Sequence, residues 1–120
     1  MAPINYHGRR FRPLSNSSNG QATAETEFVY YQDGGLLTGT YGGGGIRHGQ
    51  IVGTANADGS LEFLYQHLTG DGELRSGLCV SHPEILPDGR IRLHEDWRWT
   101  SGDQSSGQSI VEEAPEAWIQ

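Results

Sequence analysis

The chain has 120 residues, enough for one domain with its own core. Its residues are 34% hydrophobic and 19% charged, which excludes the composition of a disordered chain. The formal net charge of −7, with eight arginines and no lysine, opposes binding to phosphate backbones and anionic lipids, so we expect no nucleic acid or membrane partner.

Cysteine usage and the N-terminal segment further limit the kind of protein and its cellular location. Cys79 is the single cysteine, which excludes an intramolecular disulfide and any metal site built on several cysteines. The opening segment, "MAPINYHGRRF", lacks the apolar core of a signal peptide, and the sequence has no apolar run of membrane-spanning length. We therefore expect a cytoplasmic protein.

Taken in chain order, the sequence alternates segments of strand length with short turns. Residues 4–14 fit a strand or a broken hairpin, and the low-complexity stretch 15–24 fits a loop. Asp-Gly pairs, which suit the positive φ angles of hairpin turns, separate several of the segments that follow. Those segments are 25–31, 36–41, 46–55, 60–68, 73–81, 90–100 and 108–114.

These elements predict an all-β architecture. Turn signals every 8–12 residues or so without crossover helices are typical of an antiparallel meander, and closing a meander removes its exposed edges. We therefore expect a single antiparallel up-and-down β-barrel of about eight strands over residues 1–114, wide enough for side chains or one small ligand. Pro115 interrupts the nearest helical pattern, and residues 115–120 are expected to form a loosely held C-terminal tail.

The stretch "LHEDWRWT" places an acid on an apolar face. Leu93, Glu95, Trp97 and Trp99 alternate, so the face that should be dry carries a carboxylate. A buried carboxylate must be paired, hydrogen-bonded or protonated. Three interpretations stay open: a structural bond from Glu95 to Tyr65, a backbone amide or an arginine; a carboxylate that faces a ligand between the tryptophans; or a register in which Glu95 faces water.

The same alternation predicts the inner faces of the other strands. The expected inward residues are Thr26, Phe28 and Tyr30; Leu37, Gly39 and Tyr41; Ile46, His48, Gln50, Val52 and Thr54; and Leu61, Phe63, Tyr65 and His67. Among them, Gln50 and Tyr65 lie in the middle of their strands, as Glu95 does. We expect these three side chains to meet inside the barrel.

Metal, cofactor and phosphate motifs are weak in this sequence. The five histidines lack local metal-ligand spacing, although a barrel could bring His48 and His67 together from neighbouring strands. The glycine run 42–45 is not followed by a helix, so it fits a hairpin loop or a lid at the mouth of a barrel better than a phosphate cradle. We predict no metal site and no cofactor.

Two resemblances add to these patterns. The segment "DGGLLTGTYGGG" (33–44) resembles a hairpin of avidin-like barrels, which implies a lipocalin- or avidin-like barrel with a small-molecule site. The phrases "INYHGRRFRPLSN", "TGTYGGGGI", "PEILPDGRIRLHEDWRWTSGD" and "SIVEE" are similar to a family of small bacterial proteins that often carry the label N-acetylglutamate synthase.

The residues argue against acetyl transfer. Common N-acetyltransferases are larger α/β domains that bind pyrophosphate with a glycine-rich loop at the start of a helix. The nearest match to that loop here is "QSSGQS" (104–109). The remainder of the sequence after this match is too short for such a helix, and Pro115 interrupts it.

The leading hypothesis is that the barrel binds a small amphipathic or aromatic molecule in its interior. Its expected ligand-binding residues are Tyr41, His48, Gln50, Tyr65, Glu95 and Trp97. The alternative is a small barrel enzyme in which Glu95 is a general acid or base, assisted by Tyr65 or His67. A third hypothesis is a filled barrel that serves as an interaction module, and assembly as a homodimer stays open.

Overall fold

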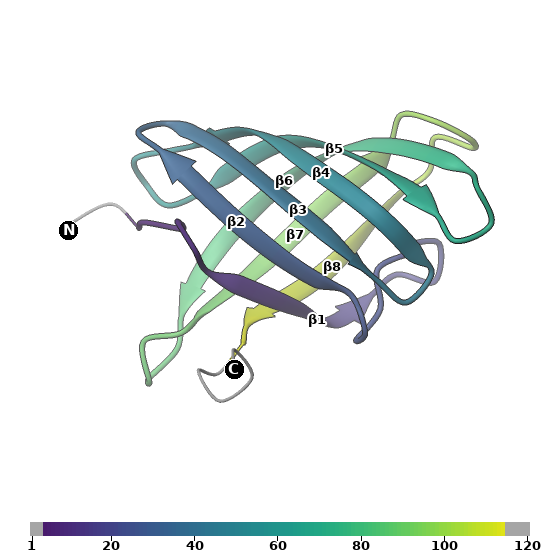
Figure 1. Cartoon of the computed structure of the whole chain (residues 1–120). Helices are drawn as coiled ribbons and strands as arrows, with labels where there is room; N and C mark the ends of the chain where they lie inside the picture. Colours follow the sequence, from purple (N-terminus) through teal and green to yellow (C-terminus); the bar gives the residue numbers. More distant parts are fainter. Residues whose placement is uncertain (1–3, 115–120) are drawn as a thin grey trace.

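Eight antiparallel strands, joined in chain order, close into a barrel in the computed structural model (Figure 1). The structure describes residues 4–114. The strands are β1 (Arg10–Asn16), β2 (Glu27–Asp33), β3 (Leu36–Gly43), β4 (Ile46–Ala55), β5 (Leu61–Thr69), β6 (Leu74–Ile85), β7 (Ile91–Trp99) and β8 (Ser106–Glu113). β8 pairs with both β7 and β1, so the sheet has no free edge. The predicted architecture is confirmed.

The ends of two elements differ from the prediction. The first strand begins at Arg10, because residues 4–9 form an irregular turn instead of the start of the predicted strand or broken hairpin. β6 continues to Ile85, beyond the predicted end at residue 81. The predicted tail, residues 115–120, lies outside the described residues. Within the described part of the chain, no helix is long and apolar enough to cross a membrane.

The two ends of the barrel are built differently. At one end, which we call the mouth, lie the loop 17–26 between β1 and β2, the tight β3–β4 turn, the β5–β6 turn and the loop between β7 and β8. The other end, the closed end, carries the β2–β3, β4–β5 and β6–β7 turns together with residues 4–9. Loop 17–26 is the longest of these connections, and we call it the mouth loop.

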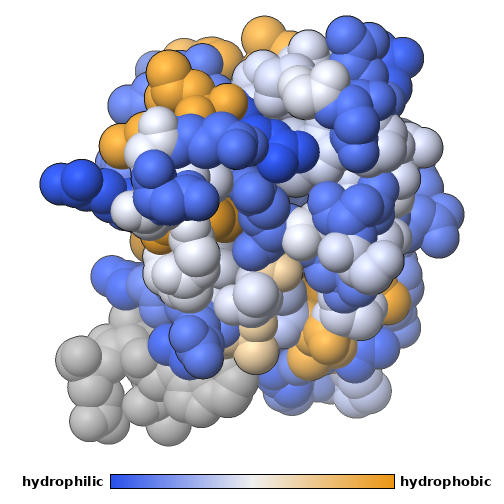
Figure 2. Space-filling model, turned by 90° about the vertical axis from the view of Figure 1, so that its right-hand side faces the viewer, coloured by the Kyte–Doolittle hydropathy of each residue, from blue (hydrophilic) through white to orange (hydrophobic). Residues whose placement is uncertain are grey.

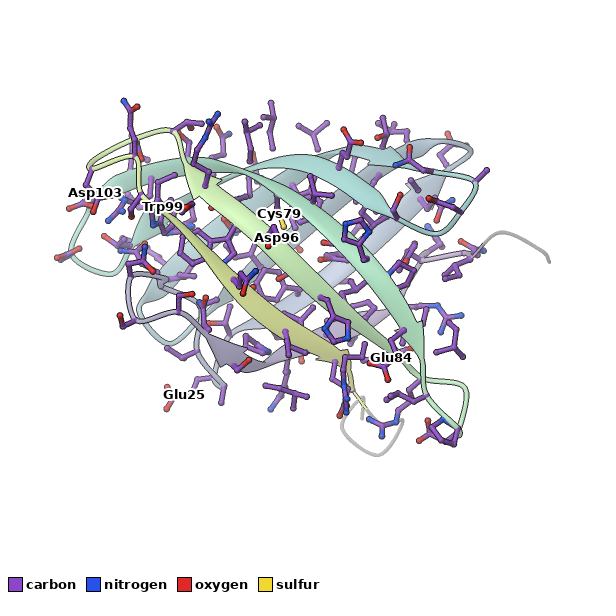
Figure 3. The ribbon with its side chains drawn as sticks, turned by 180° about the vertical axis from the view of Figure 1, so that it is seen from behind. Glu25, Cys79, Glu84, Asp96, Trp99 and Asp103 are labelled. Carbon is purple, nitrogen blue, oxygen red and sulfur yellow. The ribbon has the colours of Figure 1, made fainter. Side chains whose placement is uncertain are left out.

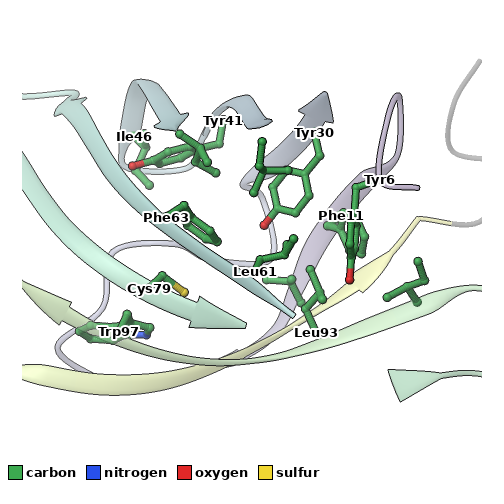
Figure 4. Packing of buried hydrophobic residues seen from close by; sticks show 14 of the residues in the cluster. Tyr6, Phe11, Tyr30, Tyr41, Ile46, Leu61, Phe63, Cys79, Leu93 and Trp97 are labelled. Carbon is green, nitrogen blue, oxygen red and sulfur yellow. The ribbon is translucent and has the colours of Figure 1, made fainter. Parts of the chain in front are cut away.

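Large apolar side chains fill the closed end. Tyr6, Phe11, Leu61 and Leu93 are fully buried and lie together in Figure 4, on the opposite side from Trp97. The Tyr6 hydroxyl donates a hydrogen bond to the carbonyl oxygen of Gly59 at 2.5 Å. Tyr6 therefore seals this end against water, and any opening of the barrel is at the mouth.

Glycines make room for the aromatic rings of the interior. Five interior aromatics each lie directly opposite a glycine of the neighbouring strand: Tyr30 and Gly39, Tyr41 and Gly49, Phe63 and Gly53, Tyr65 and Gly77, and Trp97 and Gly107. A Cβ atom on Gly49 would lie 2.3 Å from the ring of Tyr41, and one on Gly107 would lie 2.4 Å from the ring of Trp97. The rings can lie against the wall only because these positions carry no side chain.

Replacing Gly53 by alanine should lower the free energy of unfolding by about 3 kcal/mol, at the upper end of the cost of overpacking. The new Cβ would lie 2.0 Å from the carbonyl oxygen of Glu62, a backbone atom that cannot turn aside. Gly45→Ala is the matched control, because a Cβ there meets nothing within 4 Å. Urea unfolding of both variants measures the effect, and equal midpoints would contradict the prediction.

The inner face of β4 is not the one predicted. The pairing of β4 shifts between Ile46 and His48, so strict alternation breaks there. Ile46, Gly49 and Ile51 are buried, whereas the side chains of residues 48, 50, 52 and 54 are exposed. The predicted inward set of β4 is therefore wrong after its first residue. The inward sets of β2, β3, β5 and β7 are confirmed, with Tyr65 and Phe28 half-buried.

The outer surface mixes polar residues with small apolar areas. Figure 2 shows one face, where hydrophobic residues form separate small areas between hydrophilic ones. Arginine and carboxylate side chains pair across this surface, as between Arg92 and Glu112 at 2.8 Å. The charged side chains thus lie mainly outside the barrel, and among residues 4–114 Glu95 is the one Asp, Glu or Arg that is buried.

Candidate functional site

A cavity of about 60 Å³ lies inside the mouth half of the barrel. Its walls come from all eight strands and from the mouth loop, and six of the 16 lining residues are Phe, Tyr or Trp. The aromatic and aliphatic lining consists of Ala22, Phe28, Tyr41, Ile46, Ile51, Phe63, Tyr65, Trp97 and Trp99; the polar lining includes Asn16, Gln21, His67, Cys79, Glu95 and Ser109. An apolar pocket with a few polar groups is the usual form of a small-molecule site.

Glu95 is buried on the floor of the cavity between two serines. Its cross-strand neighbours are Ser81 on β6 and Ser109 on β8. The Ser81 hydroxyl donates to Oε2 of Glu95 at 3.1 Å, and the Ser109 hydroxyl donates to Oε1 at 2.9 Å. Burial raises the pKa of Glu95 to about 6, partly offset by these hydroxyls and by the Cys79 thiol. Glu95 is therefore mostly ionised at pH 7 while it lines a mainly apolar cavity.

A hydrogen-bonded chain runs from the wall to the mouth loop. The Tyr41 hydroxyl lies 2.8 Å from Nδ1 of His67, and Nε2 of His67 bonds to Oε1 of Gln21. Because a carbonyl oxygen can only accept, Nε2 carries the proton and Nδ1 accepts from Tyr41. Burial, and next the charge of Arg75, lower the pKa of His67 to about 4. His67 is thus neutral at pH 7.

The mouth loop covers part of the opening. Besides the bond between Gln21 and His67, the carbonyl oxygen of Asn19 accepts a hydrogen bond from Nε1 of Trp99 at 3.1 Å. The Asn19 side chain also donates to Ser105 and Ser106, at the start of β8. Figure 3 places Trp99 toward the end of the barrel that carries Asp103, which is the mouth. The loop therefore bridges β5, β7 and β8 across the opening.

Five of the predicted site residues come together in the structure. Tyr41, Tyr65, His67, Glu95 and Trp97 all line the cavity. Tyr65 and Trp97 each pack beside Trp99, with ring centroids 5.6 Å apart in both pairs. Their contact with a ligand stays a prediction, but their placement in one cavity follows the alternation of the sequence.

Two predicted site residues face the outside of the barrel instead of its interior. Gln50 and His48 are exposed on the outer face of β4, where Gln50 lies opposite Thr40 and Gln66. The prediction that they face the interior is wrong because the register shift after Ile46 turns both side chains outward. His48 therefore does not approach the interior His67, and residues 4–114 hold no group of three His, Cys, Asp or Glu side chains that could bind a metal.

Sequence reasoning missed the polar residues that complete the site. Asn16 and Gln21 line the cavity from the end of β1 and the mouth loop. Ser109 and Ser81 hold Glu95, yet nothing in their local sequence distinguishes them from surface serines. One signal was available: the loop between β1 and β2 is longer than the other connections of the barrel, which have two to six residues. Binding residues are often found on loops.

The hypothesis of acid–base catalysis finds partial geometric support. The pKa of Glu95, about 6, suits a general acid or base near neutral pH. His67, however, bonds to Tyr41 and Gln21 instead of Glu95. Tyr65 lies close enough for the Glu95 charge to raise its pKa, but burial is the larger cause. The arrangement therefore favours holding a polar group over moving a proton in a relay.

Comparison with known proteins supports a binding role. A family model described as "Avidin-like protein" matches residues 4–114, which include all eight strands. Barrels of this family typically bind small ligands. No curated protein matches the chain.

Proposed function

Because the chain belongs to the avidin-like protein family, we propose that its barrel binds a small organic molecule, with the head group of that molecule in the mouth cavity. The observation that carries the proposal is the cavity itself: a chamber lined by aromatic rings, with a buried carboxylate and with the mouth loop as one wall. Tyr41, Tyr65, His67, Glu95 and Trp97 are the residues that we expect the ligand to contact.

The volume of the cavity limits the size of the ligand group that can enter it. A volume of about 60 Å³ is far below the roughly 300–1,000 Å³ of sites for drug-sized ligands. Only a compact head group therefore fits inside, and the remainder of a larger ligand extends past the mouth loop.

A matched pair of variants tests this function. Ile51 lines the cavity, whereas the next residue, Val52, is 52% exposed on the outer wall. We expect Ile51→Phe to fill the cavity and abolish binding, and Val52→Phe to bind as the parent does. The probes are guanidinium, urea, acetamide and acetate at millimolar concentration. The readout is tryptophan fluorescence with Trp118 replaced by Phe, so that Trp97 and Trp99 report alone.

Saturable binding of at least one probe to the parent and to Val52→Phe, with at least a tenfold loss in Ile51→Phe (about 1.4 kcal/mol), supports the proposal. Circular dichroism first establishes that both variants are folded, because an added ring typically costs about 1–3 kcal/mol. If no probe binds, or if Ile51→Phe binds as well as the parent, the cavity is not the binding site.

A further inference from the structure

We infer that the head group taken by this cavity is a planar cation of the guanidinium or amidinium type, held by the Glu95 carboxylate against the tryptophans. This inference rests on the proposed function, because it names the chemistry of the ligand at the same site. Its basis is a carboxylate that two neutral hydroxyls hold in place and that forms no salt bridge with any residue the structure describes.

The first observation is the bonding of Glu95. Each carboxylate oxygen accepts one serine hydroxyl, Oε2 from Ser81 and Oε1 from Ser109. A carboxylate has about four acceptor positions, and the Cys79 thiol, a weak donor, engages a third. One position stays free, and an N–H group of a planar cation is a stronger donor than the thiol for the other, so such a cation can approach as arginine does in its pairs with carboxylates. The two serines thus orient the Glu95 carboxylate and leave part of its hydrogen-bonding capacity for a ligand.

The second observation is the charge around Glu95. Among residues 4–114, no salt bridge includes Glu95. The titratable groups that face it from other strands are Tyr30, Tyr65 and Cys79, and burial raises the pKa of all three, so they are neutral at pH 7. The interior therefore carries one uncompensated negative charge.

Two basic side chains lie nearer the mouth, and neither neutralises Glu95. His67 is uncharged at pH 7 and is hydrogen-bonded to Tyr41. Arg75 pairs with Glu73 at 3.1 Å, and its guanidinium carbon lies 4.3 Å from the ring centroid of Trp99. That contact also shows that a guanidinium stacks on an aromatic ring of this cavity.

A second acceptor lines the same cavity. The Oδ1 atom of Asn16 is buried and has no hydrogen-bond partner, while the Nδ2 atom of the same amide donates to the carbonyl oxygen of Ala22 at 3.0 Å. The bond to Ala22 fixes the amide, so the orphaned atom is the acceptor. A head group with several N–H donors bonds to Glu95 and presents further donors on the side of the cavity that Asn16 lines, whereas an anion would be repelled by Glu95.

Guanidinium and urea form a matched pair of probes. They are planar and nearly equal in size, and they differ in charge. On the parent chain at pH 7.5 and constant ionic strength, we expect guanidinium to bind at least tenfold more tightly than urea. We expect Glu95→Gln to reduce guanidinium affinity at least tenfold. Glu62→Gln, which changes an exposed carboxylate on the outer face of β5, should leave the affinity unchanged.

The pH dependence provides a test that needs no variant. Guanidinium affinity should fall about tenfold per pH unit once the pH drops below the pKa of Glu95, about 6, and urea affinity should not. If Glu95→Gln does not fold, this pH profile by itself tests whether the Glu95 carboxylate binds guanidinium. Binding of urea as tight as that of guanidinium, or guanidinium binding that ignores both pH and Glu95→Gln, overturns the inference while the cavity remains a binding site. Failure of every probe overturns the proposed function as well.

Discussion

Replacing Tyr6 by alanine should lower the free energy of unfolding by about 3–5 kcal/mol, the usual cost of removing a buried aromatic ring. Tyr6 is fully buried at the closed end, where its ring packs beside Phe11 and Tyr30 with centroids 6.4 and 6.2 Å away. The loss would be a large fraction of the roughly 5–15 kcal/mol that stabilises a typical domain. Urea unfolding at pH 7 measures it.

Tyr6→Phe separates the ring from its hydroxyl. The variant keeps the packing but removes the hydrogen bond to the carbonyl oxygen of Gly59, so it should cost only about 1–2 kcal/mol. Equal losses for the two variants would mean that the hydroxyl, and not the ring, seals the closed end. A loss below about 1 kcal/mol for Tyr6→Ala would mean that residues 4–9 do not form part of the core.

The second large effect is a pair of opposed pH dependences. His67 has a folded-state pKa of about 4, against 6.5 when unfolded. The unfolded chain therefore binds the proton more tightly, and stability rises by about 3 kcal/mol as the pH increases from 4 to 6.5. Glu95 has a folded-state pKa of about 6, against 4.5 when unfolded. The folded chain keeps that proton longer, so stability falls by about 2 kcal/mol between pH 4.5 and 6.

Single variants should expose each dependence. From pH 4 to 6.5, Glu95→Gln should gain about 2 kcal/mol more stability than the parent does, because the opposing contribution of Glu95 is gone. Over the same range, His67→Gln should gain about 3 kcal/mol less than the parent does. Carboxylates whose pKa is lowered, such as Asp58 and Glu112, contribute equally in all three chains, so the comparison with the parent removes them. Urea melts at several pH values give the slopes, and comparing slopes within one variant cancels any loss that is independent of pH. Parallel slopes in the two variants would contradict the burial of one of the groups.

The acid on the apolar face of β7 could be located from the sequence alone. Strict alternation from Leu93 to Trp99 placed Glu95 inward, and the structure confirms it. Its hydrogen bonds could not be predicted, because Ser81 and Ser109 reach it from two other strands whose register the sequence does not state. The structure also leaves room for both earlier interpretations, since Glu95 is hydrogen-bonded and also lines the cavity.

The error at Gln50 and His48 has a physical cause that alternation cannot detect. One extra residue after Ile46 turns the rest of β4 over, so a single irregularity exchanges its two faces. The glycines contained a correcting signal. Gly49 and Gly53 face inward, opposite Tyr41 and Phe63. Residues 49, 51 and 53 lie on the same face of β4, so two glycines on this face indicate that it, and not the face with Gln50, packs against the aromatic rings.

The closure of the barrel has a consequence for biosynthesis. β1 pairs with β8 from Phe11 to Asn16, but with β2 only at Arg10 and Phe11. The strand that leaves the ribosome first is therefore held mainly by the strand that leaves it last. Until residues 106–113 emerge, β7 has an unpaired edge and most of β1 has no partner strand, so a stalled or truncated nascent chain presents edges to which another chain can add. The open strand edges of β1 and β7 are therefore covered only after β8 has been translated and has paired with both strands.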